Sequence, residues 1–97
     1  MFRRAIERGN LLSAEAMARE MGHVTLMEAL ELTALVALRD RERASRFATR
    51  WLHRLLEEHS VTIDGAALAA CSLAALGTPA HDAAAASLVA MTEQATR

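Results

Sequence analysis

Apolar residues along the chain recur at the three- and four-residue spacing that is typical of amphipathic α-helices. The clearest pattern lies between positions 44 and 56 and contains Ala44, Phe47, Ala48, Trp51, Leu52, Leu55 and Leu56. On a helix of about 3.6 residues per turn, these side chains share one face. The pattern therefore predicts a helix that packs against its neighbours through this face.

Glycine and capping residues divide the N-terminal part into helix-sized pieces. Gly9-Asn10 separates a short first helix from a second one over residues 11–21. Gly22 stands where a left-handed residue ends a helix, because glycine adopts that conformation without steric cost. Thr25 is followed three residues later by Glu28, and this capping-box sequence predicts that a third helix begins here.

The segment from 26 to 58 contains no glycine or proline, so it forms either one long helix or two. A continuous helix would turn Asp40 and Arg41 onto the apolar face, where charged side chains are unfavourable. This favours two helices joined by a tight turn at about residues 39–42.

Two further helices are predicted after Ser60. Thr62 or Asp64 can cap the first of them, and Gly77 ends it. Pro79 fits the first turn of a last helix that reaches about Thr92. The chain is thus predicted to be one all-α domain, residues 1–97, with five to six short helices stacked as antiparallel hairpins in a short solenoid or a compact bundle.

A faint internal repeat supports the hairpin arrangement. Val24-Thr25-Leu26 recurs 37 residues later as Val61-Thr62-Ile63. A period of this size is typical of helical-hairpin arrays, whose units bury their faces by stacking on one another. Chance alignment of two leucine- and alanine-rich helices is the alternative.

Gly9-Asn10-Leu11, followed by Ala14 and Ala18, resembles the turn and second helix of a tetratricopeptide repeat. The resemblance covers about fourteen residues of one repeat. The aromatic residues of the first helix of such repeats are missing, and the 37-residue spacing exceeds theirs, which leaves a generic helical-hairpin array. The resemblance implies a protein-binding scaffold without enzymatic activity.

Composition narrows the classes of function. The net charge of -1 argues against a protein whose whole surface binds nucleic acid. The single cysteine, Cys71, excludes an internal disulfide and is typical of a reducing cytoplasm, and its apolar surroundings predict a buried, inert thiol. The longest uncharged run, residues 65–81, contains Gly77 and Pro79 and cannot cross a membrane as a helix.

Four basic residues form the most distinctive predicted surface, which we call the arginine ridge: Arg43, Arg46, Arg50 and Arg54. They share one helix face opposite the apolar stripe. Guanidinium groups match phosphates and carboxylates, so the ridge is a candidate site for nucleic acid or for an acidic partner helix. The alternative is a solvated face in which Glu42 pairs with Arg46 and Arg54 pairs with Glu58.

A second candidate surface is apolar. The helix over residues 26–38 is apolar almost all round, with Leu32, Leu35 and Val36 off its main stripe. Such a helix must be covered on all sides, either by the same chain or by a partner. These three residues are therefore a candidate interface.

No arrangement in the sequence supports catalysis, a cofactor or a metal ion. Glu20 and His23 have the spacing of half a metal motif, but Gly22 interrupts it and no second copy exists. His53 and Glu57 share a helix face without a third ligand in view. Cys71 lies in an apolar helix with no histidine at helical spacing.

The sequence therefore predicts a small cytoplasmic protein-interaction module, with no enzymatic activity and no cofactor, that binds a protein partner or its own copy through alanine- and leucine-rich helix faces. A nucleic-acid-associated accessory protein that uses the arginine ridge is the alternative.

Overall fold

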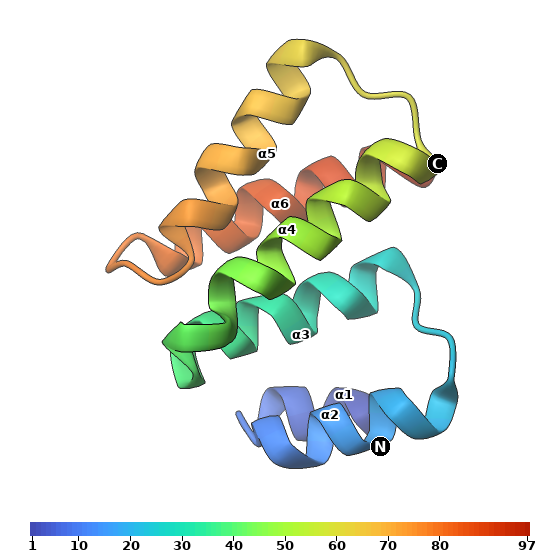
Figure 1. The fold of residues 1–97 in the computed structure, drawn as a ribbon, viewed down its shortest axis with the longest axis vertical. Coiled ribbons are helices and arrows are strands. Elements are labelled where there is room, and N and C mark those ends of the chain that lie inside the picture. Colours follow the sequence, from blue (N-terminus) through green and yellow to red (C-terminus); the bar gives the residue numbers. More distant parts are fainter.

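The computed structural model describes residues 1–97 and contains six helices and no strand (Figure 1). In chain order the helices are α1 (Phe2–Glu7), α2 (Leu11–Met21), α3 (Leu26–Arg39), α4 (Arg41–Glu58), α5 (Ile63–Ala75) and α6 (His81–Ala95). The predicted all-α class and the predicted number of helices are confirmed.

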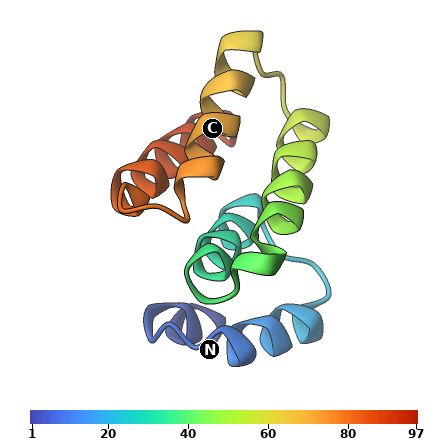
Figure 2. The same ribbon diagram turned by 60° about the vertical axis from the view of Figure 1, so that its left-hand side comes forward.

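Consecutive helices pack in pairs, α1 with α2, α3 with α4 and α5 with α6 (Figures 1 and 2). The pairs are joined by α3, which contacts α1, α2, α4 and α6. In contrast, α5 contacts only α4 and α6, so it lies at the edge of the molecule. None of the six helices combines the length and the hydrophobicity that crossing a bilayer requires.

Side-chain caps mark the start of α2, α3 and α5, and the caps of α3 and α5 are those that the sequence predicts. The Thr25 hydroxyl accepts a hydrogen bond from the Glu28 main-chain N–H at 3.1 Å, and the Glu28 carboxylate accepts one from the Thr25 N–H at 2.8 Å. Asn10 caps α2 and Thr62 caps α5 in the same way. Each cap satisfies a main-chain donor that has no partner within the helix.

A single residue, Asp40, separates α3 from α4. Its main chain leaves the helical conformation, with φ -145° and ψ 83°. The Asp40 carboxylate accepts a 2.6 Å hydrogen bond from Nε of Arg43 in the first turn of α4. The predicted turn is confirmed, and it lets the charged side chains of Asp40 and Arg41 avoid the apolar face.

The start of the last helix was predicted two residues too early. Residues 78–80 form a separate turn, in which the Thr78 hydroxyl donates to the Ala75 carbonyl and accepts from the Ala80 N–H. This turn places Pro79 before α6 rather than inside its first turn. The helix also continues beyond Thr92 to Ala95.

The apolar side chains form two cores, one on each side of α3. The larger core lies between α3, α4, α5 and α6, and the smaller one lies between α1, α2 and α3. Leu30 of α3 belongs to the larger core and Leu35 to the smaller one. Because α3 is a wall of both cores, it needs apolar residues on each of the two faces that meet them.

This arrangement corrects the candidate interface at Leu32, Leu35 and Val36. All three side chains are buried within the chain, and Val36 is 0% exposed. These three residues are covered by helices of the same chain that pack on α3 and are not open to a partner. A contact surface has to be sought elsewhere.

Candidate functional site: the arginine ridge and the α4–α5 groove

The first member of the arginine ridge, Arg43, is tied to two carboxylates of the same chain. Its two terminal nitrogens donate to the Glu15 carboxylate at 2.6 and 2.9 Å, and its Nε donates to Asp40. The pair with Glu15 links α4 to α2 and has the two-bond geometry of a strong arginine–carboxylate contact. Arg43 is therefore a structural residue.

These contacts shift the acidities of all three groups. The hydrogen bonds from Arg43 lower the pKa of Glu15, although partial burial acts in the opposite direction. The hydrogen bond from Arg43 likewise lowers the pKa of Asp40. The pKa of Arg43 is raised, because Glu15 and Asp40 stabilise its charged form.

The rest of the ridge is divided. Arg54 pairs with Glu58 at 2.6 Å, as predicted, but the predicted pair between Glu42 and Arg46 does not form. Arg46 and Arg50 are exposed and make no ion pair. The ridge thus offers two available cations rather than four.

The Phe47 ring lies close to the guanidinium groups of two members of the arginine ridge, Arg43 and Arg50. The guanidinium carbon of Arg43 is 5.5 Å from the centre of the Phe47 ring, and that of Arg50 is 6.0 Å from it. Phe47 packs against the smaller core. The guanidinium group of Arg50 therefore lies over an aromatic ring, at the outer limit of a cation–π contact, while the residue as a whole remains exposed.

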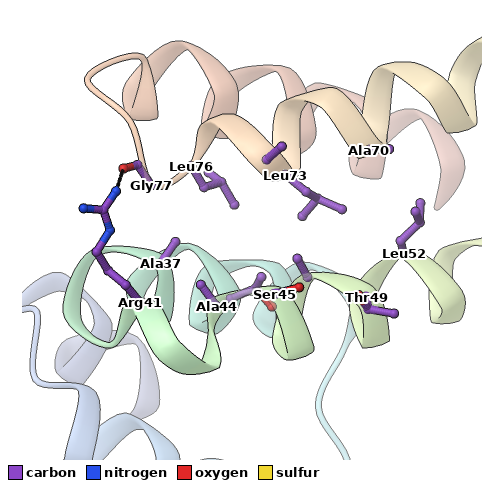
Figure 3. A pocket seen from close by; sticks show the side chains of 13 residues that line it. Ala37, Arg41, Ala44, Ser45, Thr49, Leu52, Ala70, Leu73, Leu76 and Gly77 are labelled. Atoms are coloured by element: carbon purple, nitrogen blue, oxygen red, sulfur yellow. Dashed lines mark hydrogen bonds between the residues drawn. The ribbon is translucent and has the colours of Figure 1, made fainter.

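One concave feature of the protein, which we call the α4–α5 groove, has a volume of about 460 Å³ (Figure 3). Its walls extend from Arg41 to Leu52 on α4 and from Ala70 of α5 to Gly77 just after this helix, and Thr33 and Ala37 of α3 also line it. Most of the lining is apolar, and Arg41 is the only lining residue with a charge. The groove is therefore suited to apolar side chains.

Two rows of side chains border this groove. The α4 row consists of Ser45, Thr49 and Leu52, which line the groove, and Leu56, which continues the row beyond it. The α5 row consists of Ala70, Ala74 and Gly77, which line the groove and of which Gly77 lies just after the helix, and of Ile63 and Ala67, which continue the row beyond it. Both rows follow the spacing with which helices pack side by side. Neither row contains a carboxylate. Leu56 is 45% exposed and Ile63 is 88% exposed, so the rows remain largely uncovered beyond the groove itself.

One hydrogen bond closes an end of the groove. Nη2 of Arg41 donates to the Gly77 carbonyl at 2.7 Å and joins the start of α4 to the end of α5 (Figure 3). This is the only side-chain hydrogen bond between the two walls. Arg41 remains exposed and makes no ion pair, so its charge is available at this end.

The sequence did not identify the groove. The sequence does contain a signal for it, which is the lack of charge in residues 65–80. Only α4 and α6 contact α5, so an α5 that is apolar on its other faces leaves apolar surface uncovered. The same feature corrects the prediction for Cys71, which lies on the open side of α5 and is exposed rather than buried.

Histidine and carboxylate side chains do not gather into a metal-binding arrangement. His53 and Glu57 face each other at 3.4 Å on the exposed side of α4. Comparison of the chain with family models, curated proteins and solved structures gives no match, so its function has to be inferred from its own geometry.

Proposed function

We propose that this protein is an interaction module that binds an amphipathic helix of a protein partner in the α4–α5 groove. The observation that carries the proposal is the groove itself, an apolar hollow bordered by two uncovered rows of side chains. The proposal includes no catalytic activity, cofactor or membrane insertion.

The backbone of the groove favours a helical occupant over an extended one. Both walls are helices, whose main-chain donors and acceptors are paired within the helix, so the groove offers no strand edge to an extended segment. An occupant in an apolar groove must satisfy its own main-chain polar groups, and a helix does so. The α4 row and the α5 row, each at helical spacing, together form a surface against which a third helix can pack.

Charge restricts the occupant further. The exposed guanidinium of Arg41 at the closed end favours a helix that carries an acidic residue at that end. The remaining contacts come from apolar side chains at positions that recur every three and four residues. The partner is therefore a helix with one apolar face and a carboxylate close to Arg41.

A library of helical peptides with a randomised apolar face tests this proposal. We expect the protein, immobilised at low density, to enrich peptides that bind with a dissociation constant of about 100 μM or tighter. A variant with Leu52→Glu, which puts a carboxylate into the groove, should lose these peptides. A control variant with Leu12→Glu on the exposed side of α2 should retain them. Equal enrichment by both variants would contradict the proposal.

Association with nucleic acid is the second candidate, and the available charges of Arg46 and Arg50 favour it. It ranks second because Arg43 and Arg54 are neutralised by carboxylates of the same chain. The two remaining cations, Arg46 and Arg50, can neutralise only about two phosphates of a nucleic-acid backbone.

A further inference from the structure

The groove and its border fit one particular helix. We propose, as an extension of the interaction role above, that two copies of this chain pair through antiparallel α5 helices, so that each α5 occupies the α4–α5 groove of the other copy. The proposal rests on three features of α5 and its surroundings.

The first feature is the order of side-chain sizes along the α5 row. It begins with the bulky, exposed Ile63, continues with alanines and ends at Gly77. In an antiparallel pair centred on Ala70, Ile63 of each copy faces Gly77 of the other, and Ala67 lies beside Ala74, one residue from the position directly opposite. The large side chain thus meets the position without a side chain, and the alanines let the helices approach closely. A parallel pair would bring the two isoleucines together.

The second feature is charge. Asp64 is exposed at the start of α5 and makes no ion pair, whereas Arg41 carries an available charge at the end of α5, where it holds the Gly77 carbonyl. The antiparallel register brings Asp64 of each copy to Arg41 of the other. A twofold axis makes this contact twice, as an isologous interface requires. A parallel register would place the two aspartates side by side.

The third feature is the apolar surface beside the α5 row. Leu68 and Cys71 are both exposed on α5, and no other helix of the chain covers them. In the paired arrangement α4 of the second copy lies along this side. Its Leu52 and Leu56 then cover the neighbourhood of Cys71, and the interface becomes a layer of four helices.

The solution mass gives the first test. Light scattering after size-exclusion chromatography should show twice the chain mass of 10.5 kDa at micromolar concentration. The exposed Ala70 tolerates a larger side chain in the single chain, so Ala70→Arg should keep the helical circular dichroism spectrum and raise the dimer dissociation constant at least tenfold. The matched control Leu12→Arg, on the exposed side of α2, should remain a dimer.

Cysteine cross-linking tests the register. In a Cys71→Ser background, Ala70→Cys should form a disulfide with its own copy under mild oxidation. Ala67→Cys and Ala74→Cys should cross-link only with each other when mixed, because in the proposed pair each lies about 10 Å from its own counterpart along the axis. That separation exceeds the Cα distance of about 7 Å that a disulfide can bridge.

The outcomes separate this proposal from the function on which it rests. A dimer that Ala70→Arg dissociates, with the expected cross-links, supports antiparallel pairing. A wild-type protein that is monomeric at about 100 μM but still selects helical peptides overturns the pairing and leaves the interaction role intact. A dimer that Ala70→Arg leaves unchanged, or cross-links of Ala67→Cys to itself, overturns the proposed interface.

Discussion

The indole nitrogen of Trp51 in α4 donates a hydrogen bond of 2.9 Å to the main-chain carbonyl of Leu26 in α3. Trp51 is the only tryptophan of the chain and is 2% exposed, so this bond is shielded from water. It fixes the middle of α4 against the first residue of α3 and thereby sets the position of one wall of the α4–α5 groove.

Removal of this donor should destabilise the fold. We expect Trp51→Phe to lower the free energy of unfolding by about 2 to 3 kcal/mol, because it deletes a buried hydrogen bond and leaves part of the indole volume empty. Urea unfolding followed by circular dichroism measures the change without relying on tryptophan fluorescence. A loss below about 0.5 kcal/mol, the range of ordinary surface substitutions, would show that the bond is not a stabilising contact.

The contacts of Arg43 predict how stability depends on pH. The folded-state pKa values of Glu15 and Asp40 are lowered, so both groups stabilise the fold fully above their ordinary pKa values of 4.5 and 3.8. This contribution is lost as the pH falls through the lowered folded-state values. The melting temperature should therefore fall as the pH is lowered below about 4.5.

The variant Glu15→Gln isolates this effect. Its melting temperature should lie below that of the wild type at pH 7, and the difference should shrink as the pH falls below about 4.5, because the wild-type carboxylate then takes up a proton on unfolding. Glu58→Gln is the matched control, because it removes an exposed pair with Arg54 within one helix. A Glu15→Gln difference that stays constant from pH 7 to pH 3 would contradict the assignment.

The cap of α3 should have a measurable effect on stability. Thr25→Ala removes the hydroxyl that accepts from the Glu28 N–H, and we expect a loss of about 1 kcal/mol in the free energy of unfolding. Thr49→Ala is the control, because Thr49 is exposed within α4. Chemical denaturation of both variants gives the comparison, and an equal effect at the two positions would argue against the cap.

Binding to nucleic acid can be tested through its salt dependence. Each neutralised phosphate contributes a slope of about -0.9 to the logarithm of affinity against the logarithm of salt concentration, so Arg46 and Arg50 supply no more than about -2. At physiological salt, we expect the wild-type protein to show no duplex binding that is lost in the double variant with Arg46→Glu and Arg50→Glu. Fluorescence anisotropy over a salt series measures this, and a steeper slope that the double variant removes would favour the nucleic-acid role.

Local features of the fold could be predicted from the sequence because their causes lie within a few residues. The capping box at Thr25 follows from a side chain three positions away, and the break near Asp40 follows from the apolar pattern of the residues on either side of it. The pair between Arg43 and Glu15 could not be predicted, because it joins residues 28 positions apart and depends on how α2 lies against α4. Sequence spacing identified the basic face, and tertiary packing determined which of its arginines are available.

The groove could not be predicted for a related reason. Its existence depends on the angle between α4 and α5 and on the contact of Arg41 with Gly77. The apolar character of α3 was visible in the sequence, but a helix between two cores and a helix with an open face have the same composition. The lack of charge in α5 after Asp64 was the informative signal, since α5 has only two neighbours to cover it.

The position of α3 between the two cores has a consequence for how the protein unfolds. A helix that is a wall of both cores cannot open on one side without losing the support that orders the other. The N-terminal helices therefore do not form a separable lobe, although they surround a core of their own. Main-chain amides in the middle of α3 should be the last to exchange with solvent, and they should exchange only when the whole chain unfolds.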